Sequence, residues 1–215
     1  FALQAVRNIY GLMPADMFLE HQALESNFKR SAAQYRILHL GTHAQVSDID
    51  PLQSRLFFAK EADTIAPGDD GNLYAYEIYS MQLKAELAVL FACETGRGAV
   101  HSGEGVMSLA HSFMFAGCPG VVMSLWKIDE KTNAQIVTDF YKHLKKGHTK
   151  SEALRKAKLS FLENNHGELA NPFYWGGLCV IGDDAALYST GNRLYWFMGV
   201  VIAALALVYF FRRIS

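Results

Sequence analysis

The stretch AELAVLFACETG, residues 85–96, decides the fold class of this 215-residue chain. Its first eight residues are almost entirely apolar, which suits a strand that is covered on both faces, as in a parallel sheet. A second apolar run of strand length covers 35–41, and His43 follows it closely. Both runs therefore give way to a turn at a chemically reactive residue, Cys93 in one case and His43 in the other.

Helical and extended patterns alternate around these two runs. Apolar spacing predicts helices over 5–13, 24–33, 106–114 and 136–144, and a further helix after Thr149, which has capping-box spacing to Glu152. Further strands are expected at 54–59, 121–125 and 174–181, with a short extended stretch near 17–19, whereas 47–72 is mostly turn-rich surface loop. Strands that alternate with helices favour an α/β fold, with an open, mostly parallel sheet and helices on both faces.

Reactive residues on such folds gather where parallel strands end at their carboxyl side. If the two apolar strands are neighbours, His43 and Cys93 open onto the same crevice. A thiol needs a base to become a nucleophile at neutral pH, and histidine serves as that base and later protonates the leaving amine. The backbone N–H groups of Ala44 and Cys93 are candidates to stabilise the oxyanion. The alternative from spacing alone is a buried cysteine that packs as a small apolar residue.

Several short blocks in the same order resemble the CHAT family, caspase-like domains often attached to tetratricopeptide repeats. The blocks are Ala23–Phe28, Ile37–Ala44, Leu90–Gly96, Gly103–Val106, Ala116–Gly117, Ser124–Trp126, Phe140–Tyr141, Ala153–Leu154 and Pro172–Trp175. The resemblance implies a caspase–hemoglobinase fold and, in active members, peptide hydrolysis by the residues at the positions of His43 and Cys93. Phe91 and Gly41 depart from the family, which often has Ser and Ala there. Some family members have latent activity.

The resemblance also implies that Ser124 and Trp126 border the pocket for the side chain that precedes the cleaved bond. An extended substrate could pair there with the strand edge through backbone hydrogen bonds. Asp129 is a candidate for selecting a basic side chain in that pocket. The alternative is that Asp129 caps the helix that follows it.

The sequence gives little reason to expect a cofactor, a metal ion or a nucleic-acid partner. The net charge of −1 gives no reason to expect a nucleic-acid partner. His39 and His43 are four residues apart, but they lie on a strand and lack a third ligand nearby, so we expect no metal. Gly96–Gly98 with Gly103–Gly105 lacks the Gly-Lys-Ser/Thr ending of a phosphate loop, which leaves a mobile loop beside Cys93 as the expectation. The three cysteines imply no disulfide framework.

A transmembrane helix is expected at 194–211, where 18 residues carry no charge and would span roughly 27 Å as a helix. The alternative is a buried core helix. Arg212 and Arg213 favour a cytoplasmic C-terminus, but a tail this short can insert either way, so the side of the catalytic domain stays open. The expected organisation is a caspase-like domain at 1–184, a linker at 185–193, the single membrane span at 194–211 and a tail at 212–215. The chain lacks an initiator Met and a signal peptide, so we expect it to be part of a longer protein.

These observations predict a membrane-anchored cysteine endopeptidase that acts on a protein or peptide substrate without a cofactor. We expect it to be regulated by upstream tetratricopeptide repeats or another partner. The alternative is a signalling or scaffold module that uses the same fold for protein–protein interaction without hydrolysis. A nucleotide-binding domain is disfavoured because a phosphate-binding motif is missing.

Overall fold

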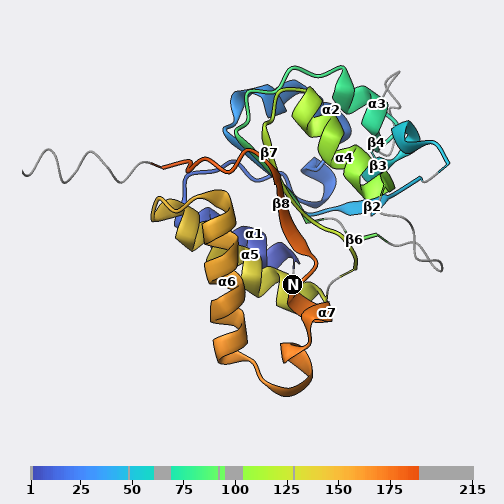
Figure 1. Cartoon of the computed structure of the whole chain (residues 1–215). Helices are drawn as coiled ribbons and strands as arrows, with labels where there is room; N and C mark the ends of the chain where they lie inside the picture. The colour runs from blue at the N-terminus through green and yellow to red at the C-terminus, as the bar shows by residue number, and fades with distance from the viewer. Residues whose placement is uncertain are drawn as a thin grey trace, which may run out of the picture.

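The computed structural model of the chain describes residues 2–47, 49–60, 69–91, 93–94, 104–127 and 129–188. Within these ranges a central four-stranded sheet carries the fold (Figure 1). Its strands, in spatial order, are β1 (Ile37–Leu40), β5 (Leu87–Leu90), β7 (Gly120–Ser124) and β8 (Leu178–Gly182). The first three are parallel and β8 is antiparallel to β7, so the expected mostly parallel sheet is confirmed.

Helices cover both faces of this sheet, as the alternating pattern predicted (Figure 1). One face carries α1 (Ala2–Leu12), α5 (Glu130–Lys145) and α6 (Lys150–Asn164), and the other carries α2 (Glu25–Ser31), α3 (Ala75–Tyr79) and α4 (Glu104–Phe115). Short 3₁₀ turns lie at Glu20–Gln22, Ala32–Gln34, Pro51–Gln53 and Gly167–Ala170. The result is a three-layer α/β arrangement, consistent with a caspase-like fold.

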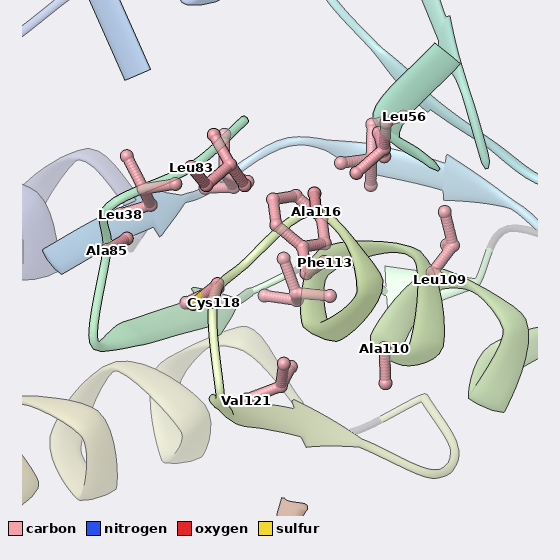
Figure 2. Close-up of a cluster of buried hydrophobic side chains, with 14 of the residues drawn as sticks. Leu38, Leu56, Leu83, Ala85, Leu109, Ala110, Phe113, Ala116, Cys118 and Val121 are labelled. Carbon is pink, nitrogen blue, oxygen red and sulfur yellow. The ribbon is translucent and has the colours of Figure 1, made fainter. Parts of the chain in front are cut away.

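The core under α2, α3 and α4 is shown in Figure 2. Phe113 and Leu109 of α4 belong to one buried cluster with Leu38 of β1 and Val121 of β7. Leu56 joins the same cluster from outside the central sheet. Full burial of each such side chain is worth about 1.5–3 kcal/mol, so this face fixes the position of the strands.

The opposite core lies under α1, α5 and α6. The predicted apolar stripe of α5 lies in one buried cluster with Leu87 and Val89 of β5. The stripe residues Ile136, Val137, Phe140 and Leu144 are all fully buried. Every residue of β5 is buried, because alternate side chains enter the two cores. The apolar composition of that strand is explained by this double coverage.

The helix ends follow the sequence signals. The Thr149 hydroxyl accepts a hydrogen bond from the Glu152 N–H at 3.2 Å at the start of α6. Gly117 ends the turn after α4 with φ of 108°, and a Cβ there would lie 2.6 Å from the Leu83 carbonyl oxygen. Glycine is required at that position by both conformation and space.

A second, smaller sheet continues from the carboxyl side of the first. Its spatial order is β4 (Asn72–Tyr74), β3 (Arg55–Phe57), β2 (His43–Gln45) and β6 (Cys93–Glu94). The β4–β3–β2 pairs are antiparallel, whereas β2 and β6 are parallel. Of this sheet, only the strand at β3 was expected from the sequence.

The predicted start of the strand expected over 174–181 is wrong, because the observed strand begins four residues later. Residues Pro172–Trp175 form α7, and β8 starts at Leu178. The Asn171 side chain accepts a hydrogen bond from the Phe173 N–H at 3.0 Å, and Pro172 occupies the first helical position. A capping side chain followed by proline favours a helical turn over an extended start, which accounts for the difference.

The membrane span expected at 194–211 and the tail after it lie outside the described residues. No helix within the described ranges combines the length and the apolar composition needed to cross a bilayer.

Candidate active site

His43 and Cys93 are direct partners in the parallel pair of β2 and β6. The same pairing already operates in the central sheet, where Leu40 of β1 lies opposite Leu90 of β5. In both of these strand pairs each residue is opposite the residue fifty positions further along the chain. The Phe91 N–H donates to the Leu40 carbonyl at 2.8 Å and links the two stretches. The two pairs therefore keep the same register, and the β2–β6 pair places His43 opposite Cys93 and Ala44 opposite Glu94.

The position of His43 is fixed by the residues on either side of it, Thr42 and Ala44. Ala44 is 4% exposed and belongs to the core, whereas the side chain of His43 is exposed. One residue earlier, the Thr42 hydroxyl donates to the Phe57 carbonyl of β3. An anchored residue on each side leaves the imidazole directed away from the core, where a substrate could reach it.

The structure describes the backbone of Cys93 and Glu94 but neither Ala92 before them nor 95–103 after them. The loop predicted at 96–105 thus falls mostly outside the described residues. Ala44 lies in a strand paired with β3 on one side and β6 on the other. The oxyanion role of the Ala44 and Cys93 N–H groups stays a prediction.

Ser124 and Trp126 lie at the carboxyl end of β7. The Ser124 hydroxyl donates to the Trp126 carbonyl at 2.5 Å, and the indole N–H of Trp126 donates to the Phe173 carbonyl at 2.8 Å. Gly177 is in close contact with both, since a Cβ there would lie 2.9 Å from the Trp126 ring and 3.0 Å from the Ser124 oxygen. Trp126 and Phe173 are 38% and 56% exposed. The exposed aromatic surface formed by Trp126 and Phe173 is a candidate pocket wall.

Sequence reasoning assigned no role to Phe173 or Gly177. The Pro172–Trp175 block and the glycine pair after it could have drawn attention to this segment. The local sequence, however, does not show that the segment contacts Trp126. The contact depends on the antiparallel pairing of β8 with β7, which also places the Leu125 N–H 3.0 Å from the Gly177 carbonyl oxygen.

Asp129 is the N-cap of α5. Its carboxylate accepts a hydrogen bond from the Thr132 N–H at 2.9 Å. The capping alternative left open by the sequence is therefore confirmed. A role for the Asp129 charge in substrate selection stays a prediction.

His39 is a half-buried histidine that lies beside two aromatic rings. Its ring lies 5.7 Å from the Tyr141 ring and 5.9 Å from the Phe91 ring, and Nδ1 shares a 3.2 Å hydrogen bond with the Tyr141 hydroxyl. Desolvation lowers the pKa of His39 to about 4, so the imidazole is neutral at physiological pH. Among the residues that the structure describes, no three His, Cys, Asp or Glu side chains gather into a possible metal site.

Cys118 and Cys179 are poor nucleophile candidates. Cys118 is fully buried, and burial raises the pKa of its thiol to about 11. Burial also raises the pKa of the half-buried Cys179 thiol. Because the thiolate is the reactive form, both side chains are held as inert thiols at neutral pH.

Comparison with known families identifies the family of this domain. The family model described as the CHAT domain matches residues 3–183. The chain belongs to the CHAT domain family. Tetratricopeptide repeat protein 28 of Homo sapiens is 28% identical over 149 residues, and the mouse protein of the same name (Mus musculus) is 27% identical over 122 residues. These alignments cover 69% and 57% of this chain but only 5% of each relative. The CHAT domain here thus corresponds to a small part of the length of both relatives.

The two departures from the usual CHAT sequence have different surroundings. Phe91 is 6% exposed and packs on His39 in the core beneath α1 and α5. Gly41 is exposed, and a Cβ there would meet only Val6, at 4.0 Å. Neither departure removes a group from the His43–Cys93 pair.

Proposed function

We propose that this CHAT domain is a cysteine endopeptidase in which Cys93 is the nucleophile and His43 the general base. The observation that carries the proposal is the register of β2 and β6, which makes the two residues direct neighbours. Neighbouring strands lie about 4.8 Å apart, and residues in register project from the same side of a sheet. A thiol and an imidazole at such positions come within reach of a proton transfer.

In the proposed reaction His43 accepts the thiol proton, and the Cys93 sulfur attacks the carbonyl carbon of the scissile bond. The protonated imidazole then donates its proton to the leaving amine, which leaves an acyl-enzyme thioester. Water, deprotonated by His43, attacks the thioester and releases the carboxylate product. The N–H groups of Ala44 and Cys93 are the proposed oxyanion donors. No cofactor takes part.

The proposed substrate is an extended segment of a protein. Ser124 and Trp126, with Phe173 beside them, would form the wall of the pocket for the residue before the cleaved bond. Asp129 would add a preference for a basic residue. Support for the wall comes from the exposed aromatic surface at the carboxyl end of β7, the edge of the sheet at which the dyad residues also follow their strands.

We also propose that the domain is attached to a membrane by a single helix at 194–211 and is regulated by upstream repeats. The apolar, uncharged sequence of that segment supports the anchor. The repeats are supported by the similarity to tetratricopeptide repeat proteins. That similarity also favours a second candidate function, a non-hydrolytic module that binds protein partners.

Reaction with a panel of peptidyl electrophiles tests the proposal. The wild-type protein should be labelled at Cys93, and Cys93→Ala should abolish the label. His43→Ala should lower the labelling rate by about 100-fold or more, the contribution typical of general base catalysis. Cys179→Ala is the matched control and should leave labelling unchanged. Equal labelling in wild type and His43→Ala would contradict the dyad and favour the non-hydrolytic module.

A further inference from the structure

The segment that follows β8 crosses the amino ends of the central strands. The Asp183 N–H donates to the Pro119 carbonyl at 2.8 Å, directly before β7. The Leu187 carbonyl accepts a hydrogen bond from the Arg36 guanidinium at 3.0 Å, directly before β1. Because β5 lies between β7 and β1, residues 183–187 pass across the amino ends of all three parallel strands.

This segment is held firmly in place. Lys150 is 1% exposed, and its ammonium donates to the Asp183 carboxylate at 2.7 Å and to the Ala185 carbonyl at 3.0 Å. Leu187 is buried in the core under α1 and α5. The Tyr188 ring, at the end of the segment, lies 5.8 Å from the Arg36 guanidinium. The chain therefore leaves the described domain at a fixed point on the amino side of the sheet.

The dyad positions lie at the opposite end of the sheet. His43 and Cys93 follow β1 and β5 at their carboxyl ends, in the parallel pair of β2 and β6. Figure 1 shows β2 and β6 on the side of the central sheet opposite to the segment after β8. The point where the chain leaves the domain and the candidate active site are thus separated by the length of the sheet.

The distance to the expected membrane span is limited by chain length. Only residues 189–193 separate Tyr188 from that span. Six steps along a fully extended chain reach at most about 20 Å. A domain of this length is about 40 Å across. A connection of half that length keeps the amino side of the sheet close to the bilayer and the carboxyl side away from it.

The amino side carries an exposed aromatic pair. Phe115, the last residue of α4, is 75% exposed, and its ring lies 5.2 Å from the ring of Tyr79 at the end of α3. The Leu83 N–H donates to the Ala116 carbonyl at 2.7 Å, so the pair lies where the chain leads into β5 and β7. Aromatic side chains with this mixture of apolar and polar surface favour the interface between lipid and water.

Three exposed lysines lie on the same side. Lys84 comes shortly before β5, and Lys145 and Lys146 end α5. The end of α5 belongs to the amino side because Lys150, after the next turn, contacts Asp183. Within the described ranges none of the three lysines pairs with a carboxylate. Their charge is therefore available to an anionic surface.

The neighbouring carboxylates are engaged within the domain. Glu86 pairs with Arg36 at 2.5 Å, and Asp183 pairs with Lys150 at 2.7 Å. The Asp184 carboxylate accepts a hydrogen bond from the Ser151 N–H at 2.5 Å. These contacts leave the lysines as the uncompensated charge on this side.

We propose that the amino side of the central sheet, with Phe115, Tyr79, Lys84 and Lys146, rests on an anionic lipid surface. The inference rests on the membrane anchor proposed above. In this orientation the His43–Cys93 pair opens away from the bilayer, at a height of about 40 Å. The substrate class that it can reach is a soluble protein, or a segment that extends well beyond the lipid surface, and not a chain segment at that surface.

Oxidation by hydroxyl radicals, read by mass spectrometry, tests the orientation. The whole 215-residue chain is placed in bilayer discs of phosphatidylcholine, with or without phosphatidylserine. Phe115 and Phe173 are a matched pair, since both are exposed and Phe173 contacts Trp126 at the carboxyl side. Oxidation of Phe115 relative to Phe173 should fall about fivefold or more in the anionic discs, because each lysine near an anionic leaflet favours docking by about that factor.

Charge variants give the second readout. Lys84→Gln combined with Lys146→Gln should return the oxidation ratio in anionic discs to the value in neutral discs. Lys127→Gln removes an exposed lysine at the carboxyl side and should leave the ratio low. The same ratio in both lipids for the wild-type chain would overturn the proposal.

Flotation with vesicles of the same lipids scores the anchor separately. A chain that floats but shows an unchanged oxidation ratio is anchored without this orientation, which overturns the present proposal alone. A chain that does not float overturns the anchor and the orientation together. Neither readout depends on hydrolysis, so the dyad is tested independently by the electrophile labelling above.

Discussion

His43 lies opposite Cys93 because the pairing that aligns Leu40 with Leu90 continues unchanged past the ends of β1 and β5. The two central strands are fixed by burial in two cores, and the dyad residues follow each strand at the same distance. A one-residue slip of either strand would turn its buried side chains to the opposite face. The packing of β1 and β5 thus determines which residue faces Cys93.

Gly41 separates β1 from β2 and should tolerate alanine. The backbone there does not need positive φ, and an added Cβ would contact only Val6, at 4.0 Å. Gly41→Ala should stabilise the protein by about 0.4–1 kcal/mol, because the unfolded chain loses conformational freedom. Chemical denaturation measures the gain, and the rate of labelling at Cys93 should stay that of wild type. A loss of stability would show that the link between β1 and β2 needs glycine.

The central sheet was predictable from the sequence, whereas the second sheet was not. β5 and β7 are apolar runs whose burial on both faces is encoded in their composition. β2, β4 and β6 contain only two or three residues, and such short strands are set by their partners rather than by their own propensity. Cys93 and His43 could be named as candidates, but their alignment required the register.

His39 should make the stability of the protein depend on pH. Its pKa is about 4 in the folded protein and about 6.5 when unfolded, so the unfolded chain binds more protons between these values. Stability should therefore fall as the pH drops from about 6.5 to 4, by about 2 kcal/mol in total from this residue. His39→Gln should flatten that part of the profile, measured by urea unfolding at a series of pH values.

His111 provides the control for this experiment. It is an exposed histidine on α4, so His111→Gln should leave the profile of the wild-type protein unchanged. If His39→Gln and wild type lose stability in parallel between about pH 6.5 and 4, the imidazole of His39 is not held neutral by its surroundings.

Gly177 should be essential for the position of Trp126. A Cβ at this position would lie 2.9 Å from the indole ring, closer than real Cβ contacts permit. Gly177→Ala should destabilise the protein by about 1–3 kcal/mol, typical of overpacking, and should displace the indole from its hydrogen bond to Phe173. Thermal unfolding and tryptophan fluorescence measure the two effects.

Gly11 is the matched site for that substitution. It lies near the end of α1, and a Cβ added there would meet nothing within 4 Å. Gly11→Ala should therefore raise stability by about 0.5–1 kcal/mol and leave the fluorescence unchanged. An unchanged fluorescence spectrum in Gly177→Ala would mean that Trp126 does not depend on the contact with Gly177.

Asp129 allows the capping and selectivity roles to be separated by two substitutions. Asp129→Ala removes the acceptor for the Thr132 N–H and should cost about 1 kcal/mol of stability. Asp129→Asn keeps an acceptor at the N-cap and should retain nearly full stability, but it removes the negative charge. If the charge selects a basic residue, Asp129→Asn should react more slowly with electrophiles that carry lysine or arginine, and equally fast with neutral ones. Thr149→Ala, which removes the cap of α6, controls for loss of a cap alone and should change stability without changing this preference. The same preference in wild type and Asp129→Asn would leave Asp129 with the capping role and assign selectivity to the wall formed by Trp126 and Phe173.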